Sequence, residues 1–205
     1  MNETRILEEH MIDAALWQKG LLIEDYISRM MTYQKEMTER VRDVRITPSE
    51  KQKLRELTLE RKIVVFTEAG CRDSLMNLPI LIKMAECALI LEVRIYPRTE
   101  NPKLRDFFDA QGLKNIPLFW IMDSNFRPLG TWMERSAPAT KQLKRWKQAN
   151  PEYDEIHENT ELTEDEKDAR LKPLRAQLVD EMWNWYDTGL QSFTISEIMD
   201  ILKKN

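Results

Sequence analysis

The chain has 205 residues and a mass of 24.4 kDa, with 42% hydrophobic and 32% charged residues, which suits one globular domain with additions or two small domains. A formal net charge of −4 and a pI near 5.5 show no basic excess, so a general nucleic-acid binder is not expected. Two cysteines and two histidines are too few for a disulfide framework and form no cluster with metal-ligand spacing, so neither a metal nor another bound cofactor is expected.

The N-terminal segment, residues 1–46, is expected to be a helical extension. It opens on acidic residues without the basic start and apolar run of a signal peptide, and no apolar run approaches a membrane span. We therefore expect a soluble, cytoplasmic protein without a membrane partner. Apolar residues then recur at spacings of three and four and predict an amphipathic helix, broken or bent near Gly20 from an earlier one. The methionines of this stripe favour a core-facing surface, with a peptide-binding face as the alternative.

The central segment, residues 47–150, alternates helices and strands. Thr47, Pro48 and Glu50 form a capping-box start for a helix that ends near Thr58. Strands are predicted at 62–67, 89–96 and 117–123, the last forming a hairpin with 128–134. Helices are predicted at 74–88, 101–111 and 137–149, the first with a kink at Pro79. This order predicts an α/β fold, a central mixed sheet with helices on both faces. The first three strands alternate with helices and predict a parallel portion with right-handed crossovers, to which the closing hairpin adds an antiparallel edge.

The C-terminal segment, residues 151–205, is expected to be a second helical extension that packs on the core. Its first part, within the acidic stretch 150–168, has weak periodicity and favours a linker. Two capping boxes, Thr163 with Glu166 and Thr194 with Glu197, predict helices reaching about residues 187 and 203. An aromatic cluster near the end of the first helix favours an anchor onto the core.

The stretch GCRDSLMNLP, residues 70–79, places Cys71 between a buried strand and a helix start, with Pro79 eight residues further on. Ile116 and Pro117 then open a later strand. These motifs, in this order and spacing, resemble the thioredoxin fold over residues 47–150. The resemblance implies that the Ile116–Pro117 peptide bond is cis, faces Cys71 and presents a backbone edge to a substrate peptide.

The longer pattern, from TEAGCRDSLMNLPIL to IPLFWIMD, is similar to a thioredoxin-like subgroup of mostly uncharacterised bacterial proteins that often carry Cys-Gly-Asp-Ser or a related motif. Three positions depart from ordinary thioredoxins. Ser74 stands where the second cysteine would be, and Gly70 replaces a tryptophan. Val65 occupies the place of a buried aspartate that moves protons during exchange.

Cys71 is the predicted nucleophile, since the start of a helix favours a thiolate through free backbone N–H groups and the helix dipole. We expect Ser74 to assist catalysis by donating a hydrogen bond to the sulfur; the alternative role for Ser74 is the helix N-cap. Arg72, Asp73, Ile116 and Pro117 are expected to border the substrate, with the Arg72 cation favouring the thiolate. Cys87 is expected to be a core residue, since sixteen helical residues at about 1.5 Å each separate it from Cys71.

With a single sulfur at this motif, the predicted chemistry is monothiol exchange. Cys71 attacks a mixed disulfide of a protein or small molecule, and an external low-molecular-weight thiol resolves the intermediate. Oxidation of Cys71 by peroxide to a sulfenic acid is a rival route. A different class of function also remains open, a thioredoxin-fold binding or scaffold module without turnover.

Overall fold

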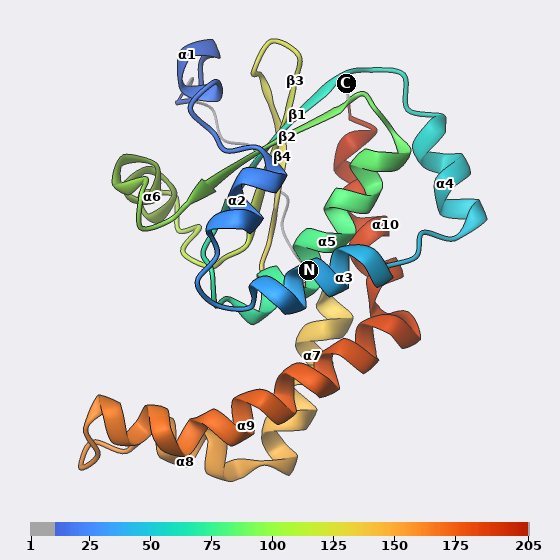
Figure 1. The fold of residues 1–205 in the computed structure, drawn as a ribbon. Helices are drawn as coiled ribbons and strands as arrows, with labels where there is room; N and C mark the ends of the chain where they lie inside the picture. The colour runs from blue at the N-terminus through green and yellow to red at the C-terminus, as the bar shows by residue number, and fades with distance from the viewer. Residues whose placement is uncertain (1–10, 205) are drawn as a thin grey trace.

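The computed structural model describes residues 11–204 as a four-stranded sheet with helices on both faces (Figure 1). The strand order is β2-β1-β3-β4. The strands are β1 (Arg61–Thr67), β2 (Leu91–Pro97), β3 (Leu118–Asp123) and β4 (Pro128–Met133). Strands β1 and β2 are parallel, whereas β3 runs antiparallel to both β1 and β4. The predicted α/β class with a mixed sheet is confirmed. The parallel portion is smaller than predicted, because β3 runs antiparallel to β1 and only β1 and β2 are parallel.

Two of the three predicted capping boxes start helices as expected, those of Thr47 and Thr163. The helices before the sheet and within it are α1 (Ala14–Trp17), α2 (Ile23–Arg29), α3 (Gln34–Asp43), α4 (Pro48–Arg55), α5 (Arg72–Cys87) and α6 (Pro102–Ala110). Those after it are α7 (Ala137–Ala149), α8 (Pro151–Glu158), α9 (Glu164–Trp185), the π-helical turn η1 (Tyr186–Leu190) and α10 (Gln191–Leu202). No helix among residues 11–204 is long and apolar enough to cross a membrane.

The sheet is buried on both faces because its side chains alternate between two hydrophobic clusters. Ile63 and Val65 of β1 belong to the larger cluster, which α5 and α10 cover. Val64 and Phe66 belong to the smaller one, which α6 covers with its aromatic residues. This two-sided burial explains why β1 reads as a continuous apolar run and not as an alternating strand.

The predicted N-terminal helix is wrong in its continuity. Residues 23–44 form two helices, α2 and α3, separated at Met30–Tyr33, where Tyr33 has the left-handed φ of 59°. Tyr26, Met30 and Met37 are all buried in the larger cluster, so the stripe is a core face. Residues 3–10 of the predicted helical region lie outside the described residues.

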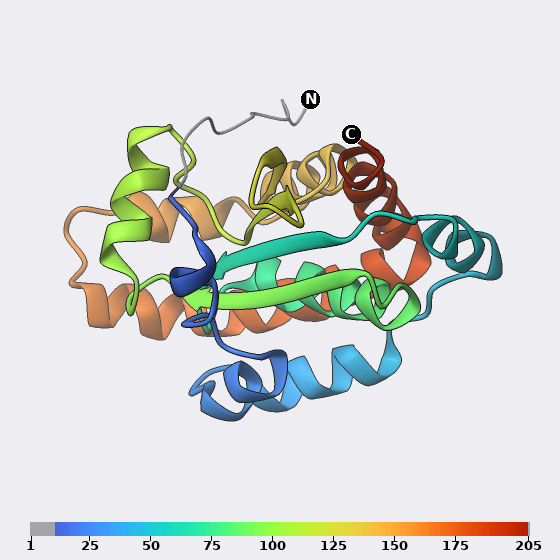
Figure 2. The same cartoon turned by 90° about the horizontal axis from the view of Figure 1, so that it is seen from above.

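Gly20 and Leu21 cover the free edge of β2, beside α2 and α3 (Figure 2). The Leu21 and Ile95 backbones exchange two hydrogen bonds of 2.8 and 2.9 Å. A Cβ at position 20 would lie 2.7 Å from Tyr96 Cζ, so only glycine fits this approach. The N-terminal segment therefore protects the edge strand from pairing with another chain.

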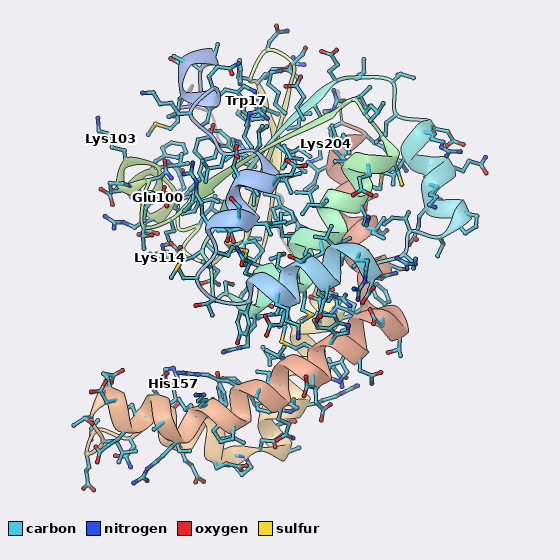
Figure 3. All side chains as sticks on the ribbon, viewed as in Figure 1. Trp17, Glu100, Lys103, Lys114, His157 and Lys204 are labelled. Carbon is cyan, nitrogen blue, oxygen red and sulfur yellow. The ribbon has the colours of Figure 1, made fainter. Side chains whose placement is uncertain are left out.

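The C-terminal segment differs from its prediction in two places. Residues 151–158 form α8, so this part of the acidic stretch is a helix and not a linker. Figure 3 shows α8, marked by His157, lying with α9 in a helical arm away from the sheet. Thr194 is not a cap: it is buried inside α10 and donates a 2.9 Å hydrogen bond to the Asn77 side chain. The aromatic anchor is Tyr186, which is 1% exposed.

Candidate functional site

Cys71 is the N-cap residue of α5, and the three residues 68–70 separate it from the end of β1 at Thr67. Gly70 has a φ of +87°, which side chains rarely adopt, and it turns the chain into the helix. A Cβ at this position would lie 3.6 Å from the Thr32 methyl group, in the loop between α2 and α3. The N-terminal extension thus lies against the loop that carries the cysteine.

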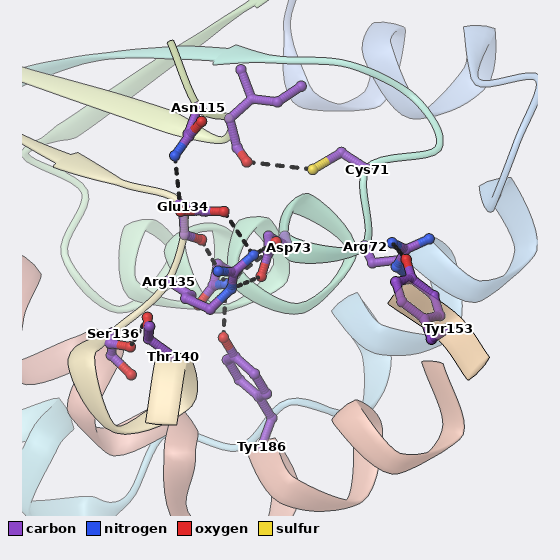
Figure 4. Close-up of polar contacts among 12 residues, drawn as sticks. Cys71, Arg72, Asp73, Asn115, Glu134, Arg135, Ser136, Thr140, Tyr153 and Tyr186 are labelled. Carbon is purple, nitrogen blue, oxygen red and sulfur yellow. Dashed lines mark hydrogen bonds and ion pairs between the residues drawn. The ribbon is translucent and has the colours of Figure 1, made fainter. Parts of the chain in front are cut away.

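The Ile116–Pro117 peptide bond is cis, and it lies beside the cysteine. The Cys71 thiol donates to the Ile116 carbonyl oxygen with a sulfur–oxygen distance of 3.4 Å (Figure 4). Cys71 is half-buried and Pro117 is buried. The structure therefore brings together two motifs that lie 45 positions apart in the sequence.

Ser74 lies in the first turn of α5 and is not its N-cap, which corrects the alternative role. Its hydroxyl is buried and lies 2.6 Å from the Thr67 hydroxyl at the end of β1. It also acts on the Cys71 sulfur, since its side chain lowers the pKa of the thiol. The Ser74 hydroxyl thus interacts with both the Cys71 sulfur and the Thr67 hydroxyl at the buried end of β1.

The pKa of the Cys71 thiol is raised, contrary to the activation that the helix start predicts. Burial is the largest cause, and the negative charge of Asp73 adds to it. The Ser74 hydroxyl and the backbone N–H groups of Asp73 and Ser74 act in the opposite direction but do not prevail. The helix start lowers the pKa of the thiol as expected, but desolvation of the sulfur raises this pKa by more.

The Arg72 side chain has a partner outside the motif. Its guanidinium donates a 2.9 Å hydrogen bond to the Tyr153 hydroxyl of α8, on the side away from the sulfur (Figure 4). This bond ties the C-terminal extension to the first turn of α5. Arg72 and Cys71 are adjacent in the sequence, and their side chains serve different partners.

Asp73 forms a two-bond ion pair with Arg135, which follows β4. Arg135 also lies 2.8 Å from Glu134, and Glu134 accepts a 3.0 Å hydrogen bond from Asn115. Burial alone would lower the pKa of Arg135, but the hydrogen bond and the charge of Asp73 raise it by a larger amount. The net pKa is raised, so the guanidinium stays charged. This polar frame links α5, the end of β4 and the loop before Pro117.

Sequence reasoning missed this frame. A signal for it exists in the predicted hairpin, because pairing β3 with β4 brings the end of β4 beside Pro117. The Glu134 backbone N–H does donate to the Pro117 carbonyl oxygen at 2.7 Å. Pairing the strands before searching for charged residues would have found Glu134 and Arg135.

Asn77 connects α5 to the C-terminal extension beneath this frame. Its amide nitrogen donates to the Tyr186 hydroxyl at 2.9 Å and to the carbonyl oxygens of Asp73 and Glu134 at 2.9 and 3.3 Å. Its amide oxygen accepts from Thr194 at 2.9 Å. Asn77 is fully buried, so these partners replace all of its contact with water.

Cys87 is the last residue of α5, and both cysteines are free thiols. Cys87 is half-buried and packs against the larger hydrophobic cluster, while Val65 is fully buried within that cluster. Across residues 11–204, no three histidine, cysteine, aspartate or glutamate side chains are grouped to hold a metal ion.

A mixed sheet, a cysteine at the start of the helix after its central strand, and a cis proline against that cysteine define a thioredoxin-like protein. The family model described as Thioredoxin matches residues 20–147, and the chain belongs to this family. The match begins well before residue 47 and so includes α2 and α3.

Two solved structures resemble the chain over nearly its whole length. One is a protein of unknown function from Pseudomonas aeruginosa, with a TM-score of 0.64, 16% identity, and coverage of 94% of this chain and 98% of the other. The second is an HIV epitope-scaffold protein, with a TM-score of 0.62, 16% identity, and coverage of 93% and 96%. At this identity the likeness shows the fold alone, helical extensions included. No curated protein matches the chain.

Proposed function

We propose that this chain is a thioredoxin-like monothiol protein in which Cys71 carries out thiol–disulfide exchange. The observation that supports the proposal is the position of the Cys71 sulfur, at the start of α5 and 3.4 Å from the carbonyl oxygen before cis-Pro117. In this proposal the Ile116 and Pro117 backbone borders the substrate. Ser74 contributes a hydroxyl where a second sulfur would be.

The exchange has two steps. The Cys71 thiolate attacks one sulfur of a mixed disulfide, forming a new S–S bond while the other sulfur leaves as a thiolate and takes up a proton. A small external thiol, as its thiolate, then attacks the sulfur joined to Cys71. This second step restores the Cys71 thiolate and leaves the external thiol in a disulfide with the substrate. The external thiol is the reductant, because Cys87 is too far along α5 to resolve the intermediate.

The substrate class in this proposal is a disulfide of a protein or of a small thiol. Asp73 and Arg135 neutralise one another at the edge of the site, and Arg72 is held by Tyr153. Asp73 is therefore neutralised and the Arg72 side chain is held in place, which suits a substrate recognised through its backbone and its disulfide. Cytoplasmic location, where small thiols are abundant, belongs to the same proposal.

The test is formation and release of a mixed disulfide on the folded Cys87→Ser variant. Oxidised glutathione is the probe, the mass of the intact chain is the readout, and Cys71→Ser is the control. We expect one glutathione adduct on Cys71 and its removal by added reduced glutathione. If Cys71 forms no adduct in the folded chain but forms one in urea, the exchange function is wrong.

A second candidate is a thioredoxin-fold binding module without turnover. The raised pKa of the Cys71 thiol favours it, because a protonated thiol is a poor nucleophile. The extensions that flank the site, through Thr32 on one side and Tyr153 on the other, favour it too. An unreactive Cys71 in the folded chain is the result that this candidate expects.

A further inference from the structure

The hydroxyl of Tyr26 is buried beside the candidate site without a hydrogen-bond partner. Tyr26 comes from α2 in the N-terminal extension and is 3% exposed. Its oxygen makes no hydrogen bond with any residue of 11–204, although the Thr67 hydroxyl is close enough to act on its pKa. A buried hydroxyl without a partner destabilises the fold, so its retention calls for an explanation.

The surroundings of Tyr26 supply that explanation. Thr67 lies between Tyr26 and Ser74, and its hydroxyl is 2.6 Å from that of Ser74. Ser74 in turn acts on the Cys71 sulfur. Three buried hydroxyls, from α2, β1 and α5, thus lie in series beside the sulfur. Neighbouring hydrogen bonds polarise one another, so a donor at the far end of such a series still stabilises a charge at the near end.

We infer that Tyr26 is a positioning residue that stabilises the Cys71 thiolate through the hydroxyls of Thr67 and Ser74. In the thiol state the Tyr26 hydroxyl has no partner. When Cys71 ionises, Ser74 donates to the thiolate, Thr67 donates to Ser74, and Tyr26 donates to Thr67. The Tyr26 hydroxyl therefore donates a hydrogen bond only when Cys71 is a thiolate, and it donates none when Cys71 is a thiol. A group that acts in this way stabilises the reactive state relative to the resting state. This inference rests on the proposed function.

The charges around these hydroxyls do not duplicate the role of Tyr26. Asp73 opposes ionisation of Cys71 from the same helix, and its own charge is paired with Arg135. Glu68 faces Tyr26 from the loop after β1 and accepts hydrogen bonds from Thr99. With Val65 in place of a buried acid, the hydroxyl series is a polar route to the sulfur that contains no charged group.

The test is the rate of Cys71 alkylation by iodoacetamide against pH in the Cys87→Ser background, for Tyr26→Phe and for the matched Tyr33→Phe control. Tyr33 lies in the same segment and lines a surface groove with residues of α9. We expect the midpoint for Tyr26→Phe to rise by about one pH unit, so that its rate at neutral pH falls about tenfold. We expect the plateau at high pH to stay, and the Tyr33→Phe profile to match the parent.

A stability measurement separates this role from a structural one. Because Tyr26→Phe removes an unpaired buried hydroxyl, we expect its urea midpoint to be equal to or higher than that of the parent, with slower thiol chemistry. Thr67→Val interrupts the series, and in that background Tyr26→Phe is expected to have no further effect on the profile. If Tyr26→Phe folds poorly, Thr67→Val alone still tests the series, because interrupting it is also expected to raise the midpoint.

Two outcomes overturn the inference, and they are distinguishable. If Cys71 reacts in the parent and the Tyr26→Phe profile coincides with it, only the role of Tyr26 is wrong. If Cys71 does not react in the folded parent, the exchange function fails and the inference fails with it.

Discussion

Replacing Asn77 with alanine is expected to destabilise the chain more than the loss of any single contact on the surface would. The fully buried side chain is shared by α5, the end of β4 and the C-terminal helices. Its removal leaves the hydroxyls of Tyr186 and Thr194 and the Glu134 carbonyl oxygen without this partner. Tyr186 and Thr194 lie on opposite sides of Gly189, the non-helical residue of η1, so the substitution affects both parts of the extension.

The expected magnitude follows from those lost partners. Leaving one buried polar group unpaired costs about 1–3 kcal/mol, but the hydroxyls can turn to other acceptors and the effects do not add fully. We therefore expect Asn77→Ala to lower the free energy of unfolding by about 3 kcal/mol. Tyr186→Phe removes one of the same bonds and is expected to cost about 1 kcal/mol.

Urea unfolding, followed by both tryptophan fluorescence and far-UV circular dichroism, measures this loss. The matched control is Asn184→Ala, on the exposed side of α9, which is expected to change stability by about 0.5 kcal/mol or less. If Asn77→Ala loses less than about 1 kcal/mol, the shared amide does not hold the extension to the core. Transitions that differ between the two signals would also refute a single cooperative unit.

Two further predictions concern stability. Gly20→Ala is expected to cost about 1–3 kcal/mol, because its Cβ would lie 2.7 Å from Tyr96 Cζ and would force the strand edge to shift; an unchanged urea midpoint would contradict this close approach. At alkaline pH, burial raises the pKa of Tyr96 to about 12 and raises those of Tyr26 and Tyr186 further. These tyrosines favour the folded state fully below about pH 10, where unfolded tyrosine is still protonated, so the unfolding free energy is expected to fall as pH rises from there. A flat dependence between about pH 10 and 12, measured by urea unfolding at each pH, would show that these hydroxyls ionise freely in the folded chain.

The fold was predictable because most of its signals are local. The capping boxes at Thr47 and Thr163 start helices at the expected residues, since both positions follow non-helical backbone. The same residue pattern fails at Thr194, where the chain is already helical from Gln191 and the hydroxyl binds Asn77. A local motif cannot distinguish these cases, because the decisive partner lies 117 positions away.

The break between α2 and α3 was hidden for a different reason. Both helices bury their apolar residues in the same hydrophobic cluster, so the spacing of three and four continues across the break. Periodicity reports which face is buried and not whether the backbone is continuous. The left-handed residue at the break is Tyr33, which carries none of the glycine or asparagine signals that usually mark this conformation.

The site was predictable only where its residues belong to the motif itself. The position of Cys71 beside Pro117 follows from the fold. The partner of Arg72 is Tyr153, and the partner of Asp73 is Arg135. Those pairings arise from packing between distant segments. They give Arg72 a partner that the motif does not reveal, because Tyr153 belongs to the C-terminal extension.

These long-range partners make the extensions part of the site. Residues 47–150 contain the sulfur, Ser74 and Pro117, yet the groups that flank the cysteine loop and the first turn of α5 lie outside that range. Thr32 lies against Gly70, and Tyr153 holds Arg72. A fragment limited to the sheet and its own helices would expose the Cys71 loop to water, which weakens the desolvation that raises the pKa of the thiol. We therefore expect the reactivity of Cys71 to depend on the full chain, with the terminal helices acting on it through burial.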